Sequence, residues 1–279
     1  MTVAIAEPVE EASGRVAGST FYLAMRIMPP TQRQAIFEIY SFCRAVDDIA
    51  DDGGPRDVQI ARLQRWRADL DAIYAGAQRQ RLSKLAEAIA AFQLRREDFM
   101  AVIDGMEMDV LSTMAAPDWA TLDLYCDRVA SAVGRLCVRV FGFDEEPGVA
   151  LAHHLGRALQ LTNILRDIDE DAGVGRLYLP LEPLLAAGIT TKVAEEAVAH
   201  PALGEVCKAV VARAEHHFQQ LGAILAASPR AVVRTPRIMA ESYRLILSRL
   251  VARGWDAPRA PVKLRRLSLV WIVLRCIVR

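Results

Sequence analysis

Residues 31–52 read TQRQAIFEIYSFCRAVDDIADD, and this stretch decides the fold class. Its apolar residues recur every three or four positions, which is the spacing of a helix with one buried face. They are Ile36, Ile39, Tyr40, Cys43 and Val46. We expect Thr31 to act as the N-cap after two prolines, and the sequence GGP at 53–55 to end the helix.

The same helical spacing returns along nearly the whole chain, whereas strand-like alternation is almost absent. Further helices are predicted at about 58–76, 81–93, 96–113, 119–142, 147–171, 192–227 and 236–253. No Gly-, Ser- or Pro-rich linker and no fixed-period repeat divides them. We therefore predict one all-α domain over residues 1–279, with a helical-bundle core and a flexible segment at about 1–17.

Composition limits the partners and the compartment. The chain has 279 residues, 53% of them hydrophobic and 24% charged, and its formal net charge is zero, so no global field favours nucleic acid. Its five cysteines are scattered without a CxxC pair, which argues against a disulfide framework or a zinc site and favours reduced thiols in the cytoplasm. The opening segment carries acids where an export signal needs bases.

The C-terminal segment has a charge of its own. Residues 253–279 contain seven Lys or Arg and a single acid, Asp256. The apolar run LSLVWIVLRCIV at 267–278 is interrupted by Arg275 and is too short to span a bilayer. Because such a helix could still rest on a membrane surface, we expect a cytoplasmic protein with peripheral contact to the inner face of the cytoplasmic membrane.

The helix at 31–52 ends in four carboxylates within six positions. In helical geometry Asp47 and Asp51 share one face, as do Asp48 and Asp52. Each like-charged pair costs an isolated helix roughly 0.2–0.5 kcal/mol. We therefore expect solvent, arginine or a metal ion to offset the charge.

A second acidic cluster, QLTNILRDIDED at 160–171, follows another apolar run. Asn163, Asp167 and Asp171 stand at i, i+4 and i+8, a column about 12 Å long at the helical rise. Carboxylate and amide oxygens without Cys or His suit a hard cation, and Mg²⁺ commonly shares its shell with substrate phosphates. Arg44 and Arg166 flank the clusters, and arginine can fork onto phosphate oxygens.

Either cluster alone would more commonly be a solvated helix end. Each, however, has a flanking arginine and an apolar helix before it. Their joint occurrence favours two helices that pack side by side, with the acids facing one another across a cavity mouth. The residues by themselves thus predict a metal-dependent enzyme that acts on a diphosphate.

Longer blocks of the chain resemble the squalene and phytoene synthase family. DDIAD and NILRDIDED resemble its two aspartate-rich motifs, YCDRVASAVGRL its central tyrosine helix, and ESYRLILSRL its late tyrosine helix. These blocks stand in the family's order and cover nearly the whole chain. MRIMPPTQRQAIFEIYSFCRAVDDIADDGG and RGWDAPRAPVKL are most similar to the bacterial members that make presqualene diphosphate for hopanoid biosynthesis.

The resemblance implies an all-α isoprenoid synthase fold of class I, a helical bundle around a central cavity. It implies a prenyltransferase that joins two farnesyl diphosphates head to head into presqualene diphosphate, releasing diphosphate. About two or three Mg²⁺ ions are implied, with Mn²⁺ as a substitute, and NADPH is not required. The proton acceptor stays open between Tyr125 and the released diphosphate, and the oligomeric state does not follow from the resemblance.

Site residues are carried over onto the matching positions of this chain. The implied metal ligands are Asp47, Asp51, Asn163, Asp167 and Asp171. The implied substrate contacts are Ser19, Thr20, Phe21, Tyr40, Arg44, Gln160, Arg166, Arg176, Tyr178 and Tyr243. The residues with an expected catalytic role are Tyr125, Asp47, Asp51, Asp167 and Arg44.

Several other features have plainer explanations. The candidates for an apolar cavity wall, which could equally be ordinary core, are Phe21, Met25, Phe37, Val129 and Val133. Ser131 stands where the family often has Gly and is expected to narrow that wall slightly. The doublets at 153–154 and 216–217 lack metalloprotease spacing, so we expect surface or hydrogen-bonded histidines. GVGRL at 173–177 matches no nucleotide fingerprint and predicts a flexible flap near the second cluster.

Three alternatives stay open. A phytoene synthase acting on two geranylgeranyl diphosphates would carry the same motifs, because chain-length choice depends on side chains at the cavity floor. So would a complete squalene synthase that reduces its intermediate with NADPH. A non-catalytic helical scaffold at a membrane surface would explain the basic tail, but not the gathered acids.

Overall fold

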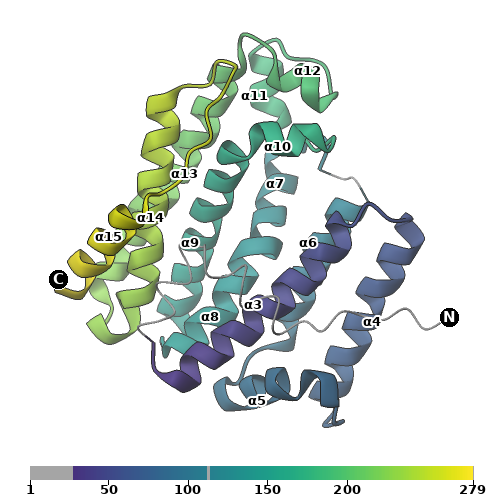
Figure 1. Cartoon of the computed structure of the whole chain (residues 1–279), viewed down its shortest axis with the longest axis vertical. Coiled ribbons are helices and arrows are strands. Elements are labelled where there is room, and N and C mark those ends of the chain that lie inside the picture. The colour runs from purple at the N-terminus through teal and green to yellow at the C-terminus, as the bar shows by residue number, and fades with distance from the viewer. Residues whose placement is uncertain (1–27, 112–113, 279) are drawn as a thin grey trace.

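The computed structural model describes residues 28–111 and 114–278, and within them the predicted all-α fold is confirmed. A 3₁₀ turn covers Gln80–Leu82, and a π-helical turn, η2, covers Asp127–Ser131. The helices are α3 (Pro30–Asp51), α4 (Arg56–Tyr74), α5 (Ser83–Phe92), α6 (Arg96–Val110), α7 (Trp119–Cys126), α8 (Ala132–Phe141), α9 (Glu145–Arg166), α10 (Ile168–Gly173), α11 (Leu181–Ala186), α12 (Ala194–Val198), α13 (Leu203–Ala227), α14 (Arg230–Arg253) and α15 (Arg266–Val278) (Figure 1).

The prolines start α3 two residues earlier than predicted. Pro29 is the N-cap, Pro30 is the first helical residue, and Thr31 makes no cap, so that prediction was wrong. Proline suits the first turn because its fixed φ is already helical and its missing N–H would have no partner there.

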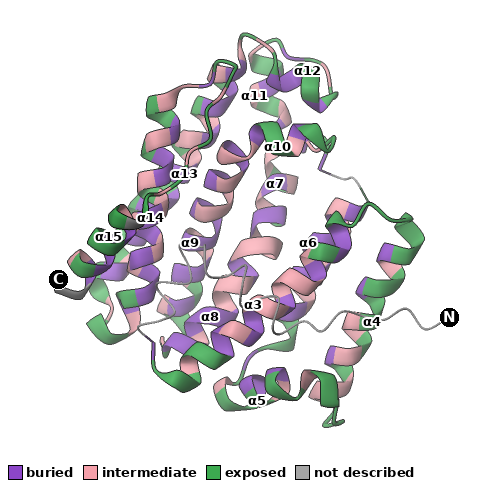
Figure 2. Ribbon diagram, in the orientation of Figure 1, coloured by how far each residue is buried: buried purple, intermediate pink, exposed green. Residues whose placement is uncertain are grey.

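Two hydrophobic clusters form the interior, on either side of η2. One gathers buried residues of α3, α4, α5, α6 and α8, and the other gathers those of α7, α9, α13 and α14. Val129 of η2 packs against both. Helix α9 contacts α8, η2, α13 and α14 (Figures 1 and 2), so the segment that carries the second acidic cluster runs through the middle of the molecule.

Two long predicted helices are divided in the structure. The segment 147–171 breaks at Asp167, between α9 and α10. The segment 192–227 breaks between α12 and α13, where His200 and Pro201 stand. Proline lacks the N–H that a continuous helix would need at that point, and α13 starts again two residues later.

Close packing around η2 places Ser131 directly against α9. A Cβ at Gly156 of α9 would lie 2.6 Å from the backbone nitrogen of Ser131, so only glycine lets α9 approach so closely. Ser131 is fully buried there, and its Oγ accepts from Arg157 at 3.0 Å and donates to the His153 carbonyl oxygen at 3.3 Å. Ser131 therefore packs against α9, and its effect on the cavity wall stays a prediction.

Helix α15 packs one face against α14. Ile272, Val273 and Cys276 form a small buried cluster with Ile238 of α14. The opposite face of α15 stays exposed (Figure 2). Across the described part of the chain, no helix combines the length and the apolar character needed to span a membrane.

Candidate active site

The acids at the end of α3 divide into two sets. Arg44 donates to Asp47 at 2.5 Å and to Asp48 at 2.6 Å. Asp52 turns towards α4, where it pairs with Arg62 and accepts from Gln59. Asp47, Asp48 and Asp51 thus remain free of α4, and Asp47 and Asp51 share one face of the helix.

The second cluster keeps its helical face through the break at Asp167. The Asp167 N–H donates to the Asn163 carbonyl at 2.9 Å, and the Asp171 N–H donates to the Asp167 carbonyl at 2.8 Å. The i, i+4, i+8 relation of Asn163, Asp167 and Asp171 therefore survives. Arg166 binds the Asp167 carboxylate with two hydrogen bonds, at 2.6 and 2.7 Å.

The two clusters meet through Arg176. This residue follows α10, and its guanidinium donates to Asp51 Oδ1 at 2.7 Å and to the Ala50 carbonyl at 3.2 Å. The carboxylate of Asp109, on α6, lies close enough to both clusters to raise the pKa of Asp47 and of Asp171. Acids 110-odd residues apart in the sequence thus face one site, and Arg176 and Asp109 bridge them where side-by-side packing of α3 on α9 was predicted.

The segment that carries Arg176 makes backbone hydrogen bonds to residues 116 and 117, at the end of the predicted flap. The Leu177 carbonyl accepts from Ala116 N–H at 2.8 Å, and Leu181 N–H donates to the Pro117 carbonyl at 2.8 Å. Gly175 has φ +78°, which favours glycine and turns the chain back from α10. Extended backbone then places Arg176 and Tyr178 on one side and the buried Leu177 on the other.

Asp109 is the centre of a buried polar triad. Tyr125 donates to its Oδ2 at 2.9 Å and Tyr178 donates to its Oδ1 at 2.7 Å, while the two rings stack with centroids 5.2 Å apart. Burial, and then the neighbouring Asp109, raise the pKa of Tyr125 far above its usual value. Both phenols are therefore neutral hydrogen-bond donors at neutral pH.

The acids carry more charge than the protein neutralises. Burial, and then the charge of Asp51, raise the pKa of Asp47 to about 6. Burial, and then Asp167, raise the pKa of Asp171 to about 7. Since the Asp47 side chain keeps 38% of its surface exposed, solvent screens part of this repulsion.

An orphaned acceptor points to the same need for a cation. Asn163 Oδ1 is buried, and no hydrogen-bond donor reaches it from the described residues, although its Nδ2 donates to Gln160 at 3.4 Å. A buried acceptor without a partner is costly in a protein. Four carboxylates and one amide oxygen form a donor set that fits a hard divalent cation such as Mg²⁺.

The remaining predicted residues fall into three groups. Tyr40 lies near Arg44 and Asp47, whose charges act on its hydroxyl. Tyr243 of α14 lies close enough to Arg166 to interact with its guanidinium. Phe37, Val129 and Val133 are partly buried in the cluster beside α3. Ser19, Thr20, Phe21 and Met25 lie outside the described residues.

Sequence reasoning missed Asp109. It lies in MEMDV at 106–110, where it reads as one of several acids on α6. Two of these, Asp104 and Glu107, pair with Arg67 of α4. Asp109 differs from Asp104 and Glu107 in that Tyr125 and Tyr178 donate hydrogen bonds to it, and this is visible only in the folded structure.

We expect Asp109→Asn to lower kcat about 100-fold. The amide would turn an N–H₂ group towards one of the two phenols, and it would remove a charge beside both clusters. Steady-state turnover, with circular dichroism to verify folding, measures the effect. Asp104→Asn on the same helix is the matched control and should keep its turnover. A wild-type kcat in the Asp109→Asn variant would show that the triad has only a structural role.

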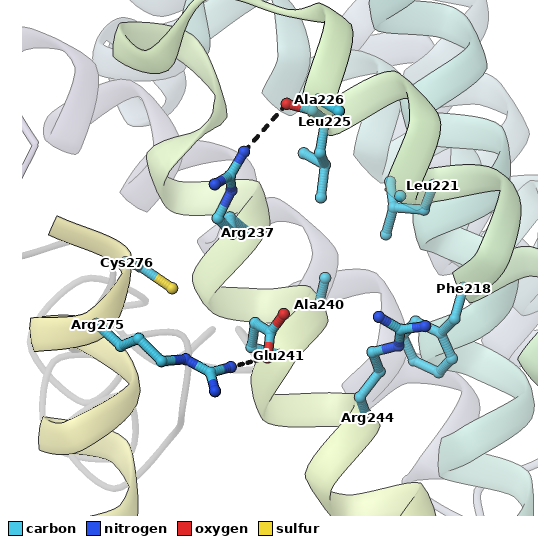
Figure 3. A pocket seen from close by; sticks show the side chains of 11 residues that line it. Phe218, Leu221, Leu225, Ala226, Arg237, Ala240, Glu241, Arg244, Arg275 and Cys276 are labelled. Atoms are coloured by element: carbon cyan, nitrogen blue, oxygen red, sulfur yellow. Dashed lines mark hydrogen bonds and ion pairs between the residues drawn. The ribbon is translucent and has the colours of Figure 1, made fainter. Parts of the chain in front are cut away.

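A cavity of about 240 Å³ lies elsewhere, between α13, α14 and α15. Figure 3 shows Arg275 of α15 pointing at Glu241 of α14, and Arg237 donating to the Leu225 carbonyl. None of the acids of either cluster lines it. It reflects how α15 docks onto α14, and the acid clusters remain the candidate active site.

The chain is similar to known proteins over most of its length. The sequence model of squalene/phytoene synthases matches residues 15–268. The presqualene diphosphate synthase of Rhodopseudomonas palustris is 56% identical over 276 residues, 99% of each chain. The 15-cis-phytoene synthase of Synechocystis sp. is more distant, at 34% identity over 213 residues, which are 72% of this chain and 63% of that one.

A solved structure shares the fold. A dehydrosqualene synthase in complex with ligand superposes with a TM-score of 0.80 at 24% identity, covering 97% of this chain and 98% of that one. At that identity the likeness supports the architecture alone. On the family match and the near-full-length similarity, this chain belongs to the squalene/phytoene synthase family and is a prenyltransferase.

Proposed function

We propose that this enzyme joins two farnesyl diphosphate molecules head to head to form presqualene diphosphate, with release of one diphosphate. The observation that carries the proposal is the 56% identity, over 99% of both chains, to a protein named presqualene diphosphate synthase. The phytoene synthase similarity is lower and covers less of each chain. The geometry of the site supports the same chemistry.

Asp47, Asp51, Asn163, Asp167 and Asp171 are the residues that would hold Mg²⁺. When bound, the ions supply Lewis acids that stabilise the charge developing on the leaving diphosphate. Arg44, Arg166 and Arg176 each pair with an acid of this set. Their guanidinium groups can turn to the phosphate oxygens, for which arginine has matching fork geometry.

The chain's apolar residues would protect the reaction. Ionisation leaves an allylic cation, and the partly buried Phe37, Val129 and Val133 can keep water from it. The double bond of the second farnesyl group attacks the cation, and loss of a proton closes the cyclopropane. Neutral Tyr125, whose proton is committed to Asp109, is a poor base. This favours the released diphosphate as the proton acceptor.

Product analysis tests the proposal. The protein is incubated with Mg²⁺ and farnesyl or geranylgeranyl diphosphate, with and without NADPH, and the products are identified by mass spectrometry. We expect a thirty-carbon diphosphate from farnesyl diphosphate in both NADPH arms. Squalene formed only with NADPH would indicate a complete squalene synthase, and forty-carbon phytoene would indicate the sister activity. No turnover, with no rise of Tm on adding Mg²⁺ and a diphosphate analogue, would indicate a scaffold.

We also propose that α15 rests on an anionic lipid surface, where a thirty-carbon product would partition. Leu267, Val270, Trp271 and Leu274 recur at i, i+3, i+4 and i+7 and form the exposed apolar face of α15. Trp271 is 60% exposed and stacks on Arg275, and the exposed Lys263 and Arg265 precede the helix. An apolar face beside basic residues is typical of helices that lie in the membrane interface.

Flotation with phosphatidylglycerol vesicles tests this contact. The wild-type protein should float with the vesicles, and Trp271→Ser with Leu274→Ser should remain largely in the soluble fraction. Val58→Ser is the matched control, since Val58 is 48% exposed on α4. A wild-type protein that stays soluble would contradict the proposal.

A further inference from the structure

Three histidines from two helices meet away from the acid clusters. His153 and His154 lie on α9, and His217 lies on α13. The Nδ1 atoms of His154 and His217 are 3.0 Å apart, and one ligand nitrogen from each of the three residues lies within 4.8 Å of the others. In the sequence these residues belong to two separate His doublets. The imidazole of His217 joins the other two only because α13 packs against α9 in the fold.

The environment leaves these imidazoles neutral. Burial, followed by the other histidines, lowers the pKa of His217 to about 4, and burial also lowers the pKa of His153 and His154. Arg157 is the nearest guanidinium, but Asp123 and Asp127 bind it at 2.9 and 3.2 Å. A metal ion would therefore meet rings that carry one proton each, and the proton of the Nδ1–H···Nδ1 hydrogen bond between His154 and His217 has to move to Nε2 of its ring before both nitrogens can bind the ion.

We propose that His153, His154 and His217 bind one borderline divalent transition-metal ion, with Zn²⁺ as the biological candidate. Zn–N bonds of about 2.0–2.1 Å place two ligand nitrogens about 3.3 Å apart in a tetrahedral site. The His154–His217 separation is close to this value. His153 must move by about 1.5 Å, within the reach of a side-chain rotation, and the half-buried rings of His153 and His154 leave water access to the fourth position, whereas His217 is buried.

Such an ion would clamp α9 to α13. Its three nitrogen ligands differ in kind from the oxygen donors at Asp47 and Asp171, so Mg²⁺ would not compete for it. Because the site lies on the same helix as Asn163, the clamp would also fix the part of α9 that leads into the acid clusters. The inference does not depend on the identity of the prenyl substrate.

Calorimetric titration with Zn²⁺ tests the proposal. The full chain, without a polyhistidine tag, is stripped with EDTA, dialysed and saturated with Mg²⁺ so that the carboxylates are occupied. We expect one Zn²⁺ per chain, with Tm rising by about 5 °C at 100-fold excess over Kd. Co²⁺ should give the intense visible d–d bands of a tetrahedral nitrogen site.

Variants locate the site. His217→Asn and His153→Asn should each weaken Zn²⁺ affinity at least 10-fold and abolish the Co²⁺ bands; His153 is half-buried, so this variant remains informative if His217→Asn misfolds. His216→Asn is the control, because His216 is exposed and lies beside the cluster. Absence of stoichiometric binding, or equal losses in the control, would overturn the proposal.

Discussion

Asp47→Asn is expected to lower kcat by about 1,000-fold or more while leaving the helical content unchanged. The substitution keeps the shape of the side chain but removes a charge that faces both Asp51 and Asp109. The α3 backbone does not depend on this carboxylate, whose hydrogen-bond partner is the neighbouring Arg44. Turnover with farnesyl diphosphate and far-ultraviolet circular dichroism measure the two effects separately.

Asp52→Asn is the matched control for Asp47. It lies in the same acidic run, but its carboxylate pairs with Arg62 and accepts from the Gly54 N–H. Turnover should stay within about twofold of wild type, with a small loss of stability. If Asp47→Asn retained near-normal kcat while Asp52→Asn did not, the assignment of the two sets of acids would be reversed.

Asp171→Asn should stabilise the protein without metal and abolish its response to Mg²⁺ with diphosphate. Because the pKa of Asp171 is raised to about 7, the folded state holds the proton more tightly than the unfolded state, where the pKa is about 3.8. The ionised group therefore costs increasing stability as pH rises from about 4 to 7. Asparagine removes this cost, of the order of 1 kcal/mol after solvent screening.

Thermal unfolding at several pH values measures the effect. The advantage of Asp171→Asn over wild type should vanish near pH 4 and be complete above pH 7. In EDTA at pH 7.5 it should amount to about 2–4 °C in Tm. The exposed neighbour variant Glu170→Gln should show neither this pH dependence nor the loss of the ligand response. A variant that is less stable at pH 7.5 would contradict the electrostatic account.

Much of the fold follows from local pattern. The 31–52 periodicity predicts α3 to within two residues at its ends, because its buried and exposed positions alternate with the helical period. The breaks at Asp167 and at 199–202 were missed, because apolar spacing continues across both. The π-helical turn at 127–131 lies where α9 approaches at Gly156, a contact that local sequence does not record.

The site divides in the same way. The acid columns are visible as i, i+4 repeats within single helices. Asp109 and His217 gain their significance from partners on other helices, Tyr178 in one case and His154 in the other. Such partners are set by tertiary packing, so a single sequence identifies the residue type without its role.

The Arg176–Asp51 contact has a consequence for the order of ligand binding. Arg176 already neutralises Asp51 of α3. A metal ion that arrives without diphosphate must therefore displace the Arg176 guanidinium, which then loses its anionic partner. Diphosphate offers that guanidinium a new anion. Metal and substrate should therefore bind synergistically, each raising the affinity of the other. Cations should bind only weakly to the enzyme without substrate.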